Sequence, residues 1–196
     1  EMMALATGDD DEVILNGLMD ASKQGDSSVR YIFSLLGVKT QFATTEQGIP
    51  TKVTLRHSGR CVPRLEYDFV NSPDLTQTFV VTCALLGVPF HFRGLATLKI
   101  KETDRIEALK KEMSKLGFEL EVRNDSELIW NGRRVVVKNA DEMAIDTYED
   151  HRMAMAFAPV ALVDGRVVIN NPQVVSKSYP RYWEDLKSVG FEIDVL

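Results

Sequence analysis

The chain has 196 residues, of which 44% are hydrophobic and 27% are charged, and its formal net charge is −6 at pH 7. This composition predicts a globular chain with a buried core, and it excludes a disordered chain and a general nucleic-acid-binding protein. A site for an anion must therefore be made locally, by cations brought together in the fold.

Cysteine content and hydropathy bear on the compartment. The two cysteines, Cys61 and Cys83, are too few for a disulfide framework, so a reducing, cytoplasmic location is expected. The longest apolar run, Met153 to Val163, is far shorter than the roughly 18 residues that span a bilayer. We expect no membrane segment. The opening "EMMALATG" resembles the end of a helix, which suggests a fragment of a longer protein.

The chain contains an internal repeat. Three apolar stretches end on a glycine turn and lead into a strand, about every 79 residues. Each is followed by a helix pattern that stops at a second glycine before an alternating strand. The glycines are Gly8, Gly87 and Gly165 in the first position and Gly37, Gly117 and Gly190 in the second. We therefore expect a single lobe, 1–196, of three repeats, roughly 1–70, 71–147 and 148–196.

The repeats contain two kinds of helix. The segments 74–86 and 151–163 are apolar nearly all round, so these helices should be buried on every side, with a kink at Pro159. The second kind is amphipathic. Its apolar stripe in the middle repeat is Ile106, Leu109, Met113 and Leu116, with Glu107 and Lys111 paired opposite. Alternating strands, and a hairpin turn at Asn131-Gly132, complete an α/β fold with buried helices and outer sheets.

Cations recur where helices are expected to begin. Lys101 and Arg105 stand at the start of the amphipathic helix, Arg152 at the start of the last buried helix, and Lys177 before a helix that Pro180 would begin. The helix dipole disfavours cations there unless an anion completes the site. Each start alone could equally be a solvated surface charge. Recurrence at equivalent places favours an anion site.

Carboxylates accompany these cations. Glu102 and Asp104 fall in the first turn of the amphipathic helix, and Asp74 follows Pro73. Such residues are often ordinary first-turn acids, but beside fixed cations a carboxylate can also act as a general acid or base. Spacing leaves both interpretations open. No cluster of His and Cys indicates a metal site.

Four segments carry a family resemblance. They are "NSPD" (71–74), "KETDR" (101–105), "YEDHRMAMAFAPVAL" (148–162) and "SKSYPRYWEDLKSVGF" (176–191). In order and spacing they resemble the carboxyl-terminal motifs of the 5-enolpyruvylshikimate-3-phosphate (EPSP) synthase family. The family's fold has two lobes, each of three repeated units with buried helices and outer sheets, and this chain resembles part of one lobe.

The resemblance implies a reaction and a set of anion contacts. The family transfers the enolpyruvyl group of phosphoenolpyruvate to the 5-hydroxyl of shikimate 3-phosphate, releasing phosphate, without a metal or other cofactor. By similarity, Arg105 and Arg152 would hold the phosphoenolpyruvate carboxylate and Lys177 its phosphate. Lys101 would contact the phosphate ester of shikimate 3-phosphate.

The resemblance also implies roles for the remaining residues. Asp74 would take the proton of the attacking hydroxyl, and Glu102 would pass a proton to and from the methylene carbon. His151 would be a supporting neighbour. Thr97 stands where the family often has an asparagine that contacts the shikimate phosphate.

The other half of the family's cleft is not found in the sequence. The amino-terminal lobe of the family contributes a Lys-Ser loop, a Ser-Ser-Gln motif and a further arginine. The missing lobe is thus the expected partner, and the chain alone is expected to be inactive. Two alternatives stay open: a UDP-N-acetylglucosamine enolpyruvyl transferase of the same fold, and a non-catalytic binding or scaffold domain.

Overall fold

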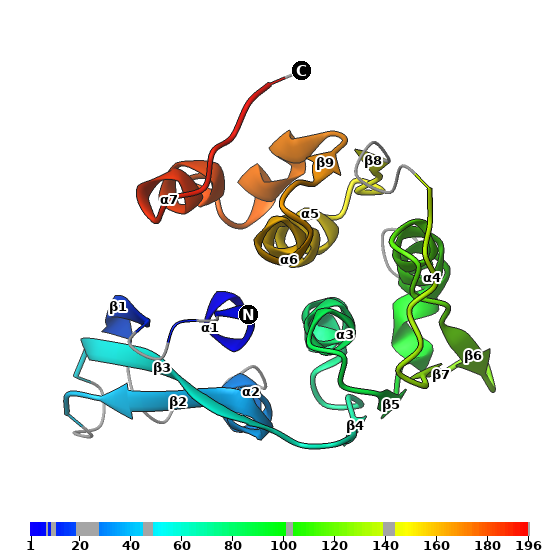
Figure 1. The fold of residues 1–196 in the computed structure, drawn as a ribbon, viewed down its shortest axis with the longest axis horizontal. Coiled ribbons are helices and arrows are strands. Elements are labelled where there is room, and N and C mark those ends of the chain that lie inside the picture. The colour runs from blue at the N-terminus through cyan, green and yellow to red at the C-terminus, as the bar shows by residue number, and fades with distance from the viewer. Residues whose placement is uncertain are drawn as a thin grey trace.

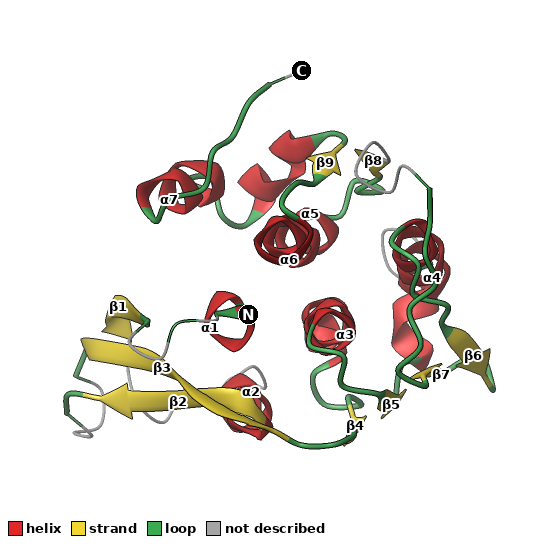
Figure 2. Ribbon diagram, in the orientation of Figure 1, coloured by secondary structure: helices red, strands yellow, loops and turns green. Residues whose placement is uncertain are grey.

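A computed structural model describes residues 1–6, 8, 11–18, 28–44, 49–100, 104–138 and 144–195. Some helices lie toward the middle of the molecule and others at its edge, and three separate sheets lie around the central ones, as Figures 1 and 2 show. This is the α/β arrangement expected from the sequence. None of the described helices is both long enough and apolar enough to cross a membrane.

The first sheet is antiparallel and belongs to the amino-terminal part of the chain. Its strands are β1 (Glu12–Leu18), β3 (Thr51–Cys61) and β2 (Leu36–Phe42), in that order across the sheet. Helix α2 (Val29–Leu35) leads directly into β2, and the short helix α1 (Met2–Leu5) packs against β2 and β3. The inward-facing side chains include Val38 and Val53, which are buried.

The second sheet has four strands and mixed directions. Strand β4 (Leu65–Asp68) is parallel to β5 (Phe90–Arg93), and the crossover between them contains the 3₁₀ turn η2 (Pro73–Leu75) and helix α3 (Thr76–Leu85). Strand β5 is antiparallel to β7 (Glu127–Trp130), which pairs with β6 (Glu121–Arg123). Between β5 and β6 run η3 (Ala96–Ile100) and helix α4 (Arg105–Lys115).

The third sheet consists of two short parallel strands, β8 (Ala144–Ile145) and β9 (Val168–Ile169). The connection between them is helical, with α5 (His151–Phe157), η5 (Ala158–Val160) and α6 (Ala161–Asp164). The chain then forms η6 (Pro172–Lys177) and α7 (Tyr182–Ser188). Helix α5 contacts both α3 and η6. The helices that connect the strands of the second sheet therefore pack against those that connect the strands of the third.

Helix α3 is buried nearly all round. Four of its side chains, Phe79, Val80, Val81 and Cys83, have no exposed surface although they point to different faces of the helix. A helix with apolar residues on every face can be stable only inside the protein. Phe79 also packs against Phe69, which in turn contacts Phe92 of β5. The expectation of an inner helix is thus confirmed for α3. It is wrong for the end of the segment 151–163, because Leu162 and Val163 of α6 are 47% and 44% exposed.

Helix boundaries differ from the sequence-based expectation at two places. The helix expected over 74–86 begins at Thr76, because Pro73 and Asp74 form the separate turn η2. The helix expected over 151–163 is interrupted by η5, which contains Pro159. Proline lacks an N–H and its ring clashes with the preceding turn, so the predicted kink is confirmed as a 3₁₀ break. The apolar stripe of α4 is buried as predicted.

The hairpin expected at Asn131-Gly132 is wrong. Strand β7 pairs with β5 and β6, and the residues after Gly132 turn away from it. Val135 N–H donates to the Gly117 carbonyl at 2.7 Å, next to a single bridge between Phe118 and Arg134. The ion pair of Glu107 also differs from the expected one with Lys111. Its Oε2 lies 3.8 Å from Lys110 Nζ instead.

Candidate functional site

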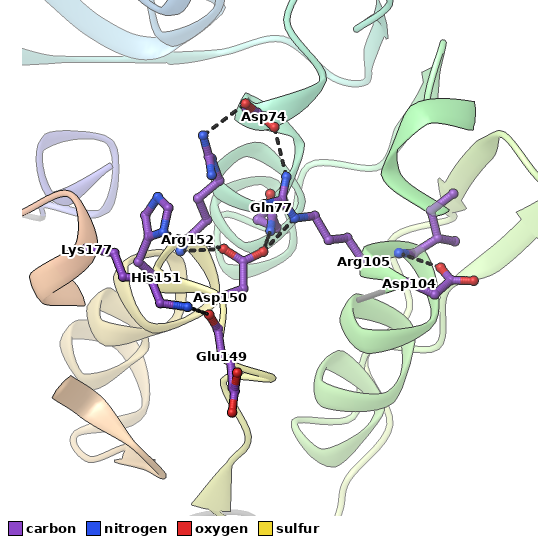
Figure 3. A network of polar contacts seen from close by, with 10 residues as sticks. Asp74, Gln77, Asp104, Arg105, Glu149, Asp150, His151, Arg152 and Lys177 are labelled. Atoms are coloured by element: carbon purple, nitrogen blue, oxygen red, sulfur yellow. Dashed lines mark hydrogen bonds and ion pairs between the residues drawn. The ribbon is translucent and has the colours of Figure 1, made fainter. Parts of the chain in front are cut away.

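Three elements converge on one cluster of charged side chains, drawn in Figure 3. The turn η2 supplies Asp74, the first residue of α4 is Arg105, and the start of α5 supplies Asp150, His151 and Arg152. The turn η2 comes before β5, α4 comes after β5, and α5 lies in the connection between β8 and β9. Residues far apart in sequence therefore meet here. The cluster lies where the helices of the second and third sheets approach each other.

The Asp74 carboxylate bridges two arginines. Its Oδ1 accepts from Arg105 Nη1 at 2.8 Å, and its Oδ2 accepts from Arg152 Nη2 at 2.9 Å. The Asp74 side chain is 33% exposed and that of Arg152 is 28% exposed. Two guanidinium groups around one planar carboxylate form the geometry that proteins use to bind carboxylates and phosphates. An internal carboxylate therefore occupies a place suited to an external anion.

Arg105 makes a second, fully buried ion pair. Its Nε lies 2.6 Å from Asp150 Oδ2, and the two side chains are 1% and 0% exposed. Gln77 Nε2 of helix α3 donates to the same oxygen at 3.0 Å. A buried charge is stable only when it is paired and hydrogen-bonded. The contact between Nε and Asp150 is an ion pair, and the hydrogen bonds are made by Arg105 Nη1 to Asp74 and by Gln77 to Asp150. The two carboxylates also compensate the unfavourable position of a cation at the first residue of α4.

Asp150 is the residue that sequence reasoning missed. Besides pairing with Arg105, its Oδ1 accepts from the Arg152 N–H at 2.9 Å and so caps helix α5. An aspartate directly before a helix is a common N-cap, and this position was the only available signal. Its burial, which turns a cap into part of a charged cluster, follows from the tertiary fold.

The backbone before Asp150 holds Lys177. The Glu149 carbonyl accepts from Lys177 Nζ at 2.8 Å, as Figure 3 shows. Tyr148 and Glu149 both have positive φ, 52° and 57°, a conformation that residues with side chains seldom adopt. This bend aims the carbonyl at the lysine and leads directly into the cap of α5.

The structure gathers five of the eight sequence-predicted site residues. Asp74, Arg105 and Arg152 are joined by the bonds above, Lys177 joins through Glu149, and His151 Nδ1 lies 4.0 Å from Asp150 Oδ1. Thr97 is exposed in η3 and no bond connects it to the cluster among the interactions of the described residues. Lys101 and Glu102 lie outside the described residues.

Two positional expectations need correction. Lys177 ends η6, and α7 begins only at Tyr182, so this lysine is not at the start of a helix. Its position at the site instead comes from the Glu149 carbonyl. The amphipathic helix, which was expected to include Asp104 in its first turn, begins at Arg105 with Asp104 as its N-cap. Lys99 lies before it in η3, and its Nζ is 2.8 Å from Asp125 Oδ1.

Within the described ranges, no group of three or more His, Cys, Asp or Glu side chains is arranged to hold a metal ion. The cluster itself consists of two carboxylates surrounded by guanidinium and amide donors, a donor set that suits anions.

The comparisons with known proteins decide the family. The family model described as EPSP synthase (3-phosphoshikimate 1-carboxyvinyltransferase) matches residues 2–186. The chain belongs to the EPSP synthase family. A 3-phosphoshikimate 1-carboxyvinyltransferase of Bacteroides fragilis is 57% identical over 184 residues, which cover 94% of this chain and 43% of the relative. One of Photobacterium damsela subsp. piscicida is 32% identical over 179 residues, 91% of this chain and 39% of the relative.

Solved structures agree on the EPSP synthase fold. An EPSP synthase from Acinetobacter baumannii superimposes with a TM-score of 0.75 at 17% identity, covering 98% of this chain and 44% of that one. At this identity the likeness concerns the fold alone. The chain spans less than half the length of these relatives.

Proposed function

We propose that the chain is part of an enzyme that transfers the enolpyruvyl group of phosphoenolpyruvate to the 5-hydroxyl of shikimate 3-phosphate, releasing phosphate. Membership of the EPSP synthase family supports this reaction, as does the name of the 57% identical relative. The observation that carries the proposal is the bridging of Arg105 and Arg152 by one carboxylate, because a substrate carboxylate could take the same place.

The cations of the cluster would bind phosphoenolpyruvate. Arg105 and Arg152 would hold its carboxylate by paired hydrogen bonds, and Lys177, a compact charge on a flexible stem, would contact its phosphate. Lys101 would contact the phosphate of shikimate 3-phosphate. This role and that of Glu102, passing a proton to and from the methylene carbon, rest on the family motif "KETDR". Thr97 and His151 would be neighbours of the bound substrates.

Asp74 would be the general base, and its present bonds set a condition on that role. Each of its oxygens accepts one hydrogen bond from an arginine and keeps a second lone pair that can receive a hydroxyl proton. Phosphoenolpyruvate bound between the guanidinium groups would nevertheless compete for them and release at least one of these bonds. The carboxylate of phosphoenolpyruvate would take over the released guanidinium. Binding of one substrate would in this way prepare the base for the other.

We further infer the organisation of the whole protein. The chain would be a single lobe, 1–196, built of three repeats over 1–70, 71–147 and 148–196. The order of the three sheets along the chain supports this division. The partner would be the other lobe of the same protein, which would supply the remaining phosphate contacts. Because Cys61 and Cys83 are both free thiols, we place the protein in the cytoplasm.

The proposal is tested by complementation. The chain is mixed with the part of the Bacteroides fragilis relative that it does not match, and phosphate release from phosphoenolpyruvate and shikimate 3-phosphate is measured. We expect activity only in the mixture, and a fall of at least about 10²-fold in kcat with Asp74→Asn, the usual scale for a general acid–base group. Asp125→Asn, in an exposed ion pair away from the cluster, is the matched control.

The remaining outcomes separate the alternatives. Turnover with UDP-N-acetylglucosamine in place of shikimate 3-phosphate would assign the other enolpyruvyl transferase reaction. A mixture in which both partners are folded by circular dichroism, but neither acceptor is used, would instead favour a scaffold domain. Turnover by the chain alone would refute the need for a second lobe.

A further inference from the structure

Residues 146–150, the segment between β8 and α5, control the positions of several groups in the cluster. The segment ends in Asp150, whose carboxylate pairs with Arg105 and caps the helix that carries Arg152. Its Glu149 carbonyl holds Lys177. A shift of this short segment would therefore move contacts to three cations at once.

The backbone of the segment does not favour its own conformation. Two successive residues, Tyr148 and Glu149, have positive φ. Residues with side chains populate this region sparsely, so the surrounding structure must hold them there. The question is which contacts supply that restraint.

Glu112 of α4 supplies it. Its side chain is completely buried, and its two oxygens receive contacts from three groups. Tyr148 OH donates to Oε1 at 2.6 Å, and the Asp146 N–H donates to Oε2 at 3.0 Å. Lys115 Nζ, one turn further along α4, lies 2.6 Å from Oε2 and balances the buried charge. The start of the segment, Asp146, and the first residue of the strained bend, Tyr148, are thus tied to one carboxylate.

The tyrosine is held as a hydrogen-bond donor. Burial, and then the bond to Glu112, raise the pKa of the Tyr148 hydroxyl above its usual value, so it keeps its proton. Lys111 of α4 also lies over the Tyr148 ring, 5.8 Å from its centroid. The ring and the hydroxyl of Tyr148 are both fixed by the same helix.

Helix α4 therefore contacts the segment 146–150 at two positions along the helix. Arg105, its first residue, binds Asp150 at one end of the segment, and Glu112, two helical turns later, binds Asp146 and Tyr148. Residues seven apart lie on the same face of a helix. One rigid helix face thus sets the distance between the bend and the site arginine.

We propose that Glu112 is a positioning residue of the site, which acts through its bonds to Tyr148 and Asp146 to place Asp150 and the Glu149 carbonyl. The identity of the substrates rests on the proposed function, whereas the mechanical coupling does not. Among the contacts of the described residues, Glu112 bonds to Tyr148, Asp146 and Lys115, and to neither Arg152 nor Lys177. Its effect on them passes through the 146–150 segment.

The coupling is tested first without any activity measurement. Amide hydrogen exchange is followed in the chain for Tyr148→Phe and Glu112→Gln, with Tyr67→Phe as control. Tyr67 packs against the same core as Tyr148. The reporter is the Arg152 N–H, which donates to Asp150. We expect its exchange to accelerate about tenfold in both test variants, the effect of losing one hydrogen bond, while amides of α3 and the control stay unchanged.

The second measurement uses the complemented mixture. For Tyr148→Phe, kcat/KM should fall about tenfold or more, because misplacement of binding groups by less than 1 Å is costly. The change should appear in the KM for phosphoenolpyruvate and leave the KM for shikimate 3-phosphate unaltered. The Tyr148→Phe/Glu112→Gln double variant should lose less than the sum of the two single losses, since both single variants affect the bond between Tyr148 and Glu112.

The outcomes are decisive in either direction. Unchanged Arg152 exchange in both variants would overturn the proposal, whether or not the mixture is active. Equal increases in exchange in α3 and at Arg152 would also overturn it, because they would show a general loss of stability. Local acceleration in an inactive mixture would uphold Glu112 as a positioning residue and count against the proposed reaction.

Discussion

At the scale of single residues, Asp150 shows how one carboxylate can serve both stability and the site. It is buried, it pairs with Arg105, it accepts from Gln77, and it caps α5. Without its charge, Arg105 would lose its buried counter-charge and keep Asp74, whose side chain is 33% exposed. Removing one partner of this buried pair should therefore cost much more stability than removing one partner of an exposed surface pair.

We predict that Asp150→Asn lowers the free energy of unfolding by about 3–5 kcal/mol, because it leaves a buried guanidinium without its closest counter-charge. Urea denaturation followed by circular dichroism measures the change. Asp125→Asn is the matched control, since Asp125 is 82% exposed in its pair with Lys99, and its cost should stay within about 1 kcal/mol. Equal costs for both variants would show that the buried pair adds nothing.

The site residues were predictable to different degrees. Arg105 and Arg152 were found because a cation at a helix start conflicts with the dipole, and that conflict is visible in the sequence. Asp150 and Glu112 were not found, because both look like ordinary helix acids until the fold buries them. Lys177 was found as a cation before an expected helix, although that helix begins only at Tyr182. Its contact to a carbonyl depends on a backbone bend that no residue pattern indicates.

At the scale of elements, the beginning of α4 depends on Asp104. Its Oδ1 accepts from the N–H groups of Ile106 and Glu107 at 3.1 and 3.2 Å. These bonds satisfy donors that have no partner within the helix. They also fix the residue at which α4 starts, and hence the position of Arg105 directly after the cap.

We predict that Asp104→Ala destabilises the chain by about 1 kcal/mol, the usual cost of losing an N-cap. Thermal unfolding by calorimetry provides the measurement. Glu107→Ala, an exposed acid in the first turn of the same helix, should cost only a few tenths of a kcal/mol. A larger loss for Glu107→Ala than for Asp104→Ala would contradict the role given to the cap.

The elements were predicted well where local pattern and burial agree. The apolar sequence of α3 and the stripe of α4 each specified a helix and its environment. The hairpin at Asn131-Gly132 failed for a tertiary reason. The Arg134 guanidinium donates to the Asp164 carboxylate at 3.0 and 2.6 Å and to the Leu116 carbonyl at 3.0 Å. These contacts draw the segment after Gly132 away from β7.

At the scale of the whole molecule, the burial of Cys83 reflects the inner position of α3. Cys83 has no exposed surface, and burial raises the pKa of its thiol far above the usual range. The reactive thiolate is therefore suppressed as well as shielded. Cys61, at the end of β3, is exposed.

We predict that a thiol-specific disulfide reagent modifies Cys61 rapidly and Cys83 at least about 10³-fold more slowly, because α3 is exposed only by global unfolding. The Cys61→Ser variant isolates the slow reaction. Its rate should rise steeply with urea, in step with the loss of circular dichroism. Rapid labelling of Cys83 without urea would mean that α3 is not the centre of the fold.

The carboxylate bridge at Asp74 has a consequence for selectivity among anions. Because Asp74 belongs to the chain, it competes for Arg105 and Arg152 at a fixed effective concentration, unlike a free ion. Simple carboxylates and inorganic ions at cellular concentrations must displace it before they can settle between the guanidinium groups. A molecule that also makes contacts elsewhere in the site gains additional binding free energy, which can offset the cost of displacing Asp74. We therefore expect the bridge to weaken the binding of simple anions at the cationic cluster.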